Sequence, residues 1–87
     1  MKIIRFSALW CMSCILMKSR WLQVLKTHPN LEVIDYDFDE HSKEVIKYQV
    51  GNILPVVIFV QNDIEVTRII GEKSLKELNK ILETMGL

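Results

Sequence analysis

Hydrophobic and polar residues form short blocks along the chain, and the spacing of these blocks predicts alternating strands and helices. Residues 2–7, KIIRFS, are rich in β-branched and aromatic side chains, which favours a strand. Residues 31–36, LEVIDY, indicate a second strand. Between them, four apolar residues recur at spacings of three and four, as on the buried face of a helix that ends before Pro29: Cys14, Met17, Trp21 and Leu25. A connection of roughly 20 residues is long enough for a crossover, so we expect the two strands to be parallel.

The second half of the chain predicts one further short helix and a hairpin. Residues 42–50 suit a helix that Gly51 ends. The segment after Pro55, VVIFV, is so continuously apolar that we expect a central strand covered on both faces. Turn-forming residues follow it, and residues 65–70, EVTRII, return as its hairpin partner.

The last helix is marked by Ser74 and Glu77, which have the spacing of a capping box, and Gly86 closes it. Its apolar positions are Leu75, Leu78, Ile81, Leu82 and Met85. The predicted order is therefore β-α-β-α-β-β-α. This order indicates an α/β fold in a single domain over residues 1–87, with a four-stranded mixed sheet and helices on both faces.

The only two cysteines, Cys11 and Cys14, stand three apart between the first strand and the first helix. A helix N-terminus favours an anion, so we expect Cys11 to be the nucleophilic thiolate. Cys14, one turn further on, is expected to be shielded and to keep its proton. Its sulfur would lie beside that of Cys11, because residues three apart share a helical face. It could therefore resolve a mixed disulfide formed by Cys11.

Metal binding and a structural disulfide are the alternatives for these thiols. A structural zinc site usually needs four ligands, and the chain adds only His28 and His41, to which we assign no role. Two chains sharing four thiolates around a metal ion or an iron–sulfur cluster remain an open alternative. A disulfide that closes so short a loop would add little stability.

Charge and composition narrow the partners and the compartment. The 87 residues include 11 basic and 11 acidic side chains, so the formal net charge is zero and no footprint for nucleic acid or an anionic membrane is present. The N-terminus lacks the pattern of a signal peptide, and no segment is apolar for the length of a membrane span. We therefore expect a cytoplasmic protein. In that reducing compartment, a cysteine pair favours redox chemistry or metal binding over a permanent disulfide.

Three features together give the chain a family resemblance. It has W-C-x-x-C at residues 10–14, a proline at Pro55 ahead of the third strand, and Gly71 ahead of the last helix. In these it resembles a small thioredoxin or glutaredoxin. The resemblance implies strand order 2-1-3-4, with the third and fourth strands antiparallel to the first two, and no cofactor beyond the redox-active pair of cysteines.

The same resemblance implies a substrate-binding surface next to the cysteines. The Leu54–Pro55 bond is expected to be cis and to lie against them, where the backbone of Leu54 can pair with an extended substrate. Trp10 is expected to form a partly exposed platform beside the thiols, whereas Trp21, on the helix stripe, is expected in the core.

One departure from the family pattern concerns the residue six positions before the first cysteine. Thioredoxins usually carry a buried acid there, which relays the proton of the second thiol, whereas this chain has Arg5. Its guanidinium must reach solvent, find a carboxylate, or reflect a shifted strand register. Candidate partners for the carboxylates of glutathione are Lys18, Lys43 and Lys47.

The sequence thus favours a thiol–disulfide oxidoreductase that reduces protein disulfides, with Cys11 as nucleophile and Cys14 as resolving thiol. Its expected partners are disulfide-containing proteins and an upstream reductase or glutathione, and it is expected to act as a monomer. The alternatives are a glutathione-coupled, glutaredoxin-like protein and a non-catalytic dimeric carrier of a metal or iron–sulfur cluster.

Overall fold

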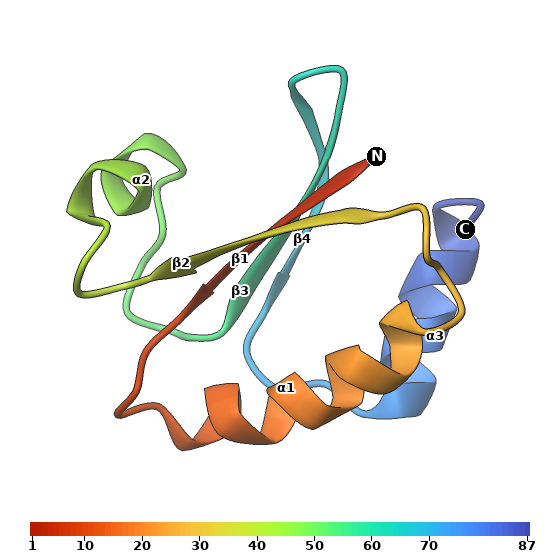
Figure 1. Cartoon of the computed structure of the whole chain (residues 1–87), viewed down its shortest axis with the longest axis horizontal. Helices are drawn as coiled ribbons and strands as arrows, with labels where there is room; N and C mark the ends of the chain where they lie inside the picture. The colour runs from red at the N-terminus through yellow and green to blue at the C-terminus, as the bar shows by residue number, and fades with distance from the viewer.

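The structure is a computed structural model that describes residues 1–87. Its elements follow the predicted order (Figure 1). They are β1 (Lys2–Ser7), α1 (Met12–Leu25), β2 (Glu32–Asp37), α2 (Ser42–Lys47), β3 (Val56–Gln61), β4 (Ile64–Ile70) and α3 (Leu75–Thr84). No helix combines the length and apolar character needed to cross a bilayer.

The sheet has the predicted strand order, β2-β1-β3-β4. β1 and β2 are parallel, and β3 is antiparallel to β1. The expected direction of the fourth strand was wrong. β4 is antiparallel to β3 and therefore runs in the same direction as β1 and β2. The reason is that a tight hairpin joins β3 to β4 and reverses the direction of the chain. The two turn residues, Asn62 and Asp63, both have positive φ, which is the conformation that a two-residue hairpin turn requires to match the twist of the strands.

Helix α2 ends earlier than the sequence indicated, and Gly51 does not end it. Its last helical residue is Lys47, and Gln49 adopts the left-handed conformation, with φ of 54°. The N–H of Val50 then donates to the carbonyl of Val45 at 2.9 Å, which satisfies one of the free carbonyls at the helix end.

Two apolar clusters lie on opposite faces of the sheet. α1 and α3 cover one face, where Trp21 and Leu78 pack against Ile3 of β1, and α2 lies beyond the other face (Figure 1). The second cluster contains Phe6 and Ile58 together with Cys11 and Cys14. All five residues from Val56 to Val60 are buried, which confirms the prediction of a central strand. The two cysteines, at the N-terminal end of α1, are therefore packed against side chains of the sheet.

Removal of the α3 cap should lower stability. The Ser74 hydroxyl accepts the N–H of Glu77 at 3.1 Å, and the Glu77 carboxylate accepts the N–H of Ser74, so the predicted capping box is present. For Ser74→Ala we expect the free energy of unfolding, measured in urea, to fall by about 1 kcal/mol. The control is Ser19→Ala, an exposed position inside α1, which should be neutral or slightly stabilising. Equal effects of the two substitutions would contradict the assigned cap.

Candidate active site

Cys11 is the N-cap residue of α1, with extended backbone angles and its sulfur turned over the first helical turn. Its Sγ accepts the backbone N–H of Cys14 at 3.2 Å, while its own N–H donates to the carbonyl of Ala8 at 3.2 Å. The sulfur thus occupies the position that a Ser, Thr, Asp or Asn oxygen usually fills. Unpaired N–H groups and the helix dipole favour negative charge at this end of a helix.

Cys14 differs from Cys11 in its bonding more than in its exposure. The exposed fraction of Cys14 is 7%, so this thiol is shielded as predicted, and Cys11 is buried to nearly the same extent, with an exposed fraction of 8%. Burial, the hydrogen bond with Cys11 and the charge of Cys11 together raise the pKa of the Cys14 thiol to about 11, with burial the largest cause, whereas a backbone hydrogen bond with Ala8 opposes the shift. At neutral pH, Cys14 is therefore a protonated thiol next to the capping sulfur.

Trp10 forms the exposed platform that the sequence indicated, and its orientation is fixed. Its exposed fraction is 60%, yet its indole Nε1 donates to Asp39 at 2.8 Å and its ring meets Phe38 edge-on. Sequence analysis missed Asp39. The parallel register of β1 and β2 contained the signal, because it places the segment after Asp37 beside the segment after Ser7.

The loop before β3 carries the predicted cis Leu54–Pro55 bond. Leu54 is buried in the same apolar cluster as the two cysteines, which places this loop against them. The N–H of Gly71, whose φ is +83°, donates to the carbonyl of Pro55 at 2.8 Å and so ties the end of β4 to the loop. By contrast, the backbone N–H and carbonyl of Leu54 bond to no other group of the chain.

Arg5 is neutralised by a carboxylate, one of the three outcomes that the sequence left open. Its Nε and Nη2 donate to the two oxygens of Asp35 at 2.7 and 2.8 Å, directly across the parallel β1–β2 pair. A guanidinium paired in this way cannot accept a proton. No carboxylate contributes to the pKa shift of Cys14, so the acid relay of the family pattern has no counterpart at Arg5.

Exposed apolar side chains surround the cysteines. They come from the loop after β1, from the first turns of α1 and from the loop before Pro55, and comprise Leu9, Trp10, Met12, Ile15 and Ile53. We call these five residues the apolar rim. Such a group of apolar residues around a reactive centre is typical of a surface that contacts another molecule.

The remaining candidate ligands do not converge on the site. His28 bonds to the carbonyl of Val24, and the Nδ1 of His41 accepts the N–H of Asp37. The structure has no group of three or more His, Cys, Asp or Glu side chains placed to hold a metal ion. Lys18 is on α1, whereas Lys43 and Lys47 are on α2, beyond the opposite face of the sheet, so these lysines do not form one site.

Comparison with known proteins places this geometry in a family. The Thioredoxin family model matches residues 1–84. Thioredoxin H5 of Oryza sativa subsp. japonica is 25% identical over 84 residues, with 90% of this chain and 62% of the relative covered. The mitochondrial thioredoxin of Mus musculus is 27% identical, with coverages of 95% and 50%. The chain thus spans about half to three-fifths of the length of these curated relatives.

Solved structures show the same fold. The crystal structure of thioredoxin from Trypanosoma brucei brucei superposes with a TM-score of 0.85 at 23% identity, covering 97% of this chain and 73% of that one. The fold, the position of the C-x-x-C pair at the start of α1 and the family match agree. The chain belongs to the thioredoxin family.

Proposed function

We propose that the chain is a thiol–disulfide oxidoreductase that reduces protein disulfides by dithiol exchange. The observation that carries this proposal is the N-cap position of Cys11, whose sulfur accepts the N–H of Cys14 and is adjacent to its thiol. This arrangement places one sulfur at a helix N-terminus, where anions are favoured, next to a thiol that keeps its proton at neutral pH. The redox equivalents reside in the two sulfurs, so the reaction needs no bound cofactor.

The reaction has two exchange steps. The Cys11 thiolate attacks one sulfur of the substrate disulfide, which forms a mixed disulfide and releases the first substrate thiolate. Cys14 then loses its proton and attacks the sulfur of Cys11, which releases the second substrate thiolate and leaves a Cys11–Cys14 disulfide. The substrate disulfide is reduced by two electrons, and the protein dithiol is oxidised by the same two.

The pKa of Cys14 suits the order of these steps. Two causes that raise it, the hydrogen bond with Cys11 and the charge of Cys11, depend on a free Cys11 sulfur. When Cys11 becomes part of a mixed disulfide it carries no charge, so these contributions fall, and burial and the opposing backbone hydrogen bond with Ala8 remain. Cys14 therefore becomes easier to deprotonate at the stage where it has to attack.

Substrate recognition is assigned to the loop before β3 and to the apolar rim. The free N–H and carbonyl of Leu54 can bond to the backbone of an extended segment, as an added strand would. Trp10, held by Asp39, and Ile53 would then contact apolar side chains on both sides of the substrate disulfide. A protein segment with apolar residues beside its cysteines fits this surface.

Regeneration requires a two-electron donor for the Cys11–Cys14 disulfide. The curated relatives are thioredoxins, which favours a thioredoxin reductase as this donor, and the separated lysines provide no common site for glutathione. We assign the protein to a reducing compartment such as the cytoplasm, where the dithiol would be maintained, and to action as a monomer.

Covalent trapping tests the roles of the two cysteines. A peptide with one intramolecular disulfide and a fluorescent label is incubated with each variant, followed by non-reducing electrophoresis. Cys14→Ser should accumulate a labelled adduct that dithiothreitol releases, because a serine hydroxyl cannot displace the Cys11 thiolate from the mixed disulfide. Cys11→Ser should trap little, and the double variant provides the baseline. A stronger adduct with Cys11→Ser would reverse the assigned roles, and a lack of adducts combined with bound metal in the wild type would favour the carrier alternative.

Alkylation as a function of pH tests the protonation of Cys14. Burial is the largest cause that raises the pKa of Cys14, and it persists in Cys11→Ser, where the charge of Cys11 is absent, so Cys14 stays mostly protonated at pH 7.5. At this pH, iodoacetamide should modify Cys14 of Cys11→Ser at least about tenfold more slowly than Cys11 of Cys14→Ser. The rate for Cys14 should rise as the pH increases, because the thiolate fraction grows toward the pKa. N-acetylcysteine serves as the reference thiol, and equal rates for the two variants would contradict the assignment.

A charge on the apolar rim tests protein docking separately from the chemistry. For Ile53→Asp we expect kcat/KM with a disulfide-bonded protein to fall about tenfold, because a carboxylate would have to be desolvated at the contact. The rate with the small substrate hydroxyethyl disulfide should be almost unchanged. Leu22→Asp is the matched control, since Leu22 is also apolar and exposed but lies in the last turn of α1, away from Cys11. Parallel losses on both substrates, or an equal loss in the control, would argue against docking at this rim.

A further inference from the structure

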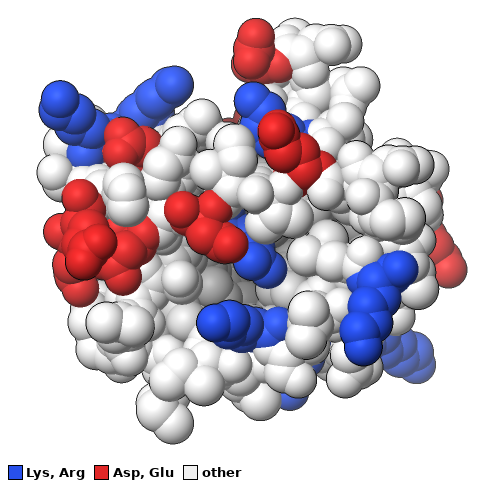
Figure 2. All heavy atoms as spheres, in the orientation of Figure 1, with Lys and Arg blue, Asp and Glu red and all other residues white.

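An open cavity of about 340 Å³ lies between α1 and the β1–β2 pair, with Cys14 in its wall. Figure 2 shows it as a hollow in the face of the molecule, with basic and acidic side chains at its margin. Its volume is at the lower end of the range for small-molecule sites, and eight of its 14 lining residues are hydrophobic. Cys11, the proposed nucleophile, does not line this cavity, whereas Cys14, the proposed resolving thiol, does.

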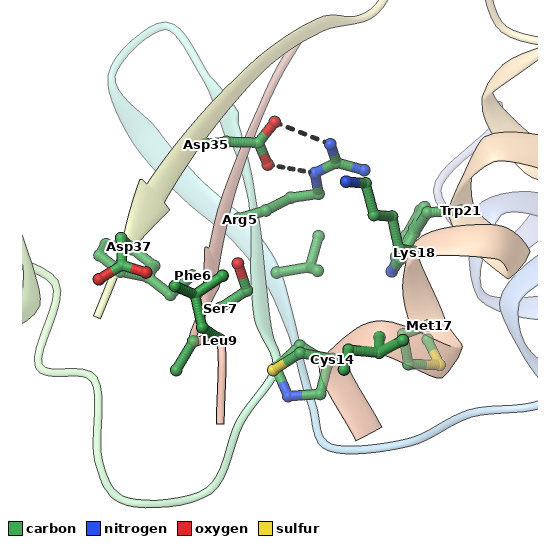
Figure 3. Close-up of a pocket in the computed structure, with 14 residues that line it drawn as sticks. Arg5, Phe6, Ser7, Leu9, Cys14, Met17, Lys18, Trp21, Asp35 and Asp37 are labelled. Carbon is green, nitrogen blue, oxygen red and sulfur yellow. Dashed lines mark hydrogen bonds and ion pairs between the residues drawn. The ribbon is translucent and has the colours of Figure 1, made fainter. Parts of the chain in front are cut away.

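The end of the cavity next to α1 carries an uncompensated positive charge. Arg5 and Lys18 extend toward this end from β1 and α1 (Figure 3). Asp35 compensates Arg5 with both of its oxygens, but Lys18 takes part in none of the three ion pairs of the chain. Asp37 lies at the opposite end in Figure 3, where its carboxylate accepts the backbone N–H groups of Asp39 and Glu40.

A buried hydrogen-bond donor also lacks a partner in this wall. Trp21 lines the cavity with an exposed fraction of only 2%, and its Nε1 is the one buried side-chain nitrogen or oxygen of the chain without a hydrogen bond. Leaving such a donor unpaired costs about 1–3 kcal/mol. Lys18 is three residues before Trp21 and therefore next to it on the helix surface, and both residues line this cavity.

We propose that this cavity binds a small organic monoanion, a carboxylate with an apolar body. The carboxylate would compensate the charge of Lys18 and accept hydrogen bonds from Trp21 and from Nη1 of Arg5, which has no partner in the chain. The body would lie against the apolar wall formed by Met17, Ile15 and Val57. One uncompensated cation and a mostly apolar lining favour a monoanion over a phosphate group or a neutral ligand.

The test follows the two indole N–H resonances of the ¹⁵N-labelled protein, kept reduced with uncharged dithiothreitol, during titration with benzoate. The resonance of Trp21 should shift in a saturable manner. That of Trp10, which is bonded to Asp39 outside the cavity, is the internal control and is assigned with Trp10→Phe. Benzamide, which has the same shape without the charge, should bind at least about fivefold more weakly, the equivalent of one partly exposed ion pair.

Variants on α1 locate the anion. Lys18→Met should weaken benzoate binding about fivefold, whereas Lys26→Met, an exposed lysine at the end of the same helix and outside the cavity, should not change it. The proposal is overturned if the Trp21 resonance does not shift in a saturable manner, if benzamide binds as tightly as benzoate, or if both lysine substitutions have the same effect. The readout is binding to the reduced protein, so it is independent of whether the chain reduces protein disulfides.

Discussion

The cap that the Cys11 sulfur provides to α1 is the interaction on which the rest of the site depends. A sulfur in this position serves two purposes at once. It satisfies a free N–H at the start of the helix, and it places the sulfur that we propose as the nucleophile where the helix dipole favours an anion. Helix capping and reactivity therefore meet at one side chain, but only the reactivity requires sulfur, since a serine oxygen can also cap a helix.

Three segments distant in sequence are arranged around this cap. The parallel pairing of β1 and β2 brings Asp39 into hydrogen-bond contact with Trp10. The loop with the cis Leu54–Pro55 bond packs against the two cysteines. Gly71, just after β4, donates a backbone hydrogen bond to this loop. Each contact comes from a strand end or from the residues just beyond it. The sheet thus positions the surface on which we propose that a substrate docks, while α1 positions the two cysteines.

Local patterns in the sequence predicted most of the elements, because burial periodicity and capping act over a few residues. The capping box of Ser74, the central strand at residues 56–60 and the strand order were confirmed. The end of α2 was wrong because Gln49, rather than a glycine, takes the left-handed conformation, stabilised by bonds that propensity does not reveal. The partners of Arg5 and Trp10 were missed for a different reason. Both are carboxylates roughly 30 positions away, and only the register of two strands brings them into contact.

The ion pair between Arg5 and Asp35 has a consequence for strand alignment. The backbone bonds of two parallel strands can form in several registers, so the side chains must distinguish among them. In the observed register the guanidinium faces a carboxylate across the strands, whereas a shift of β2 by one residue would place it opposite Ile34 or Tyr36 and leave both charges unmatched. The ion pair therefore lowers the free energy of the observed register relative to the shifted ones. The observed register is also the one in which Asp39 accepts the hydrogen bond of Trp10. An ion pair between neighbouring strands therefore adds to the apolar pattern in favouring the register that completes the surface beside the two cysteines.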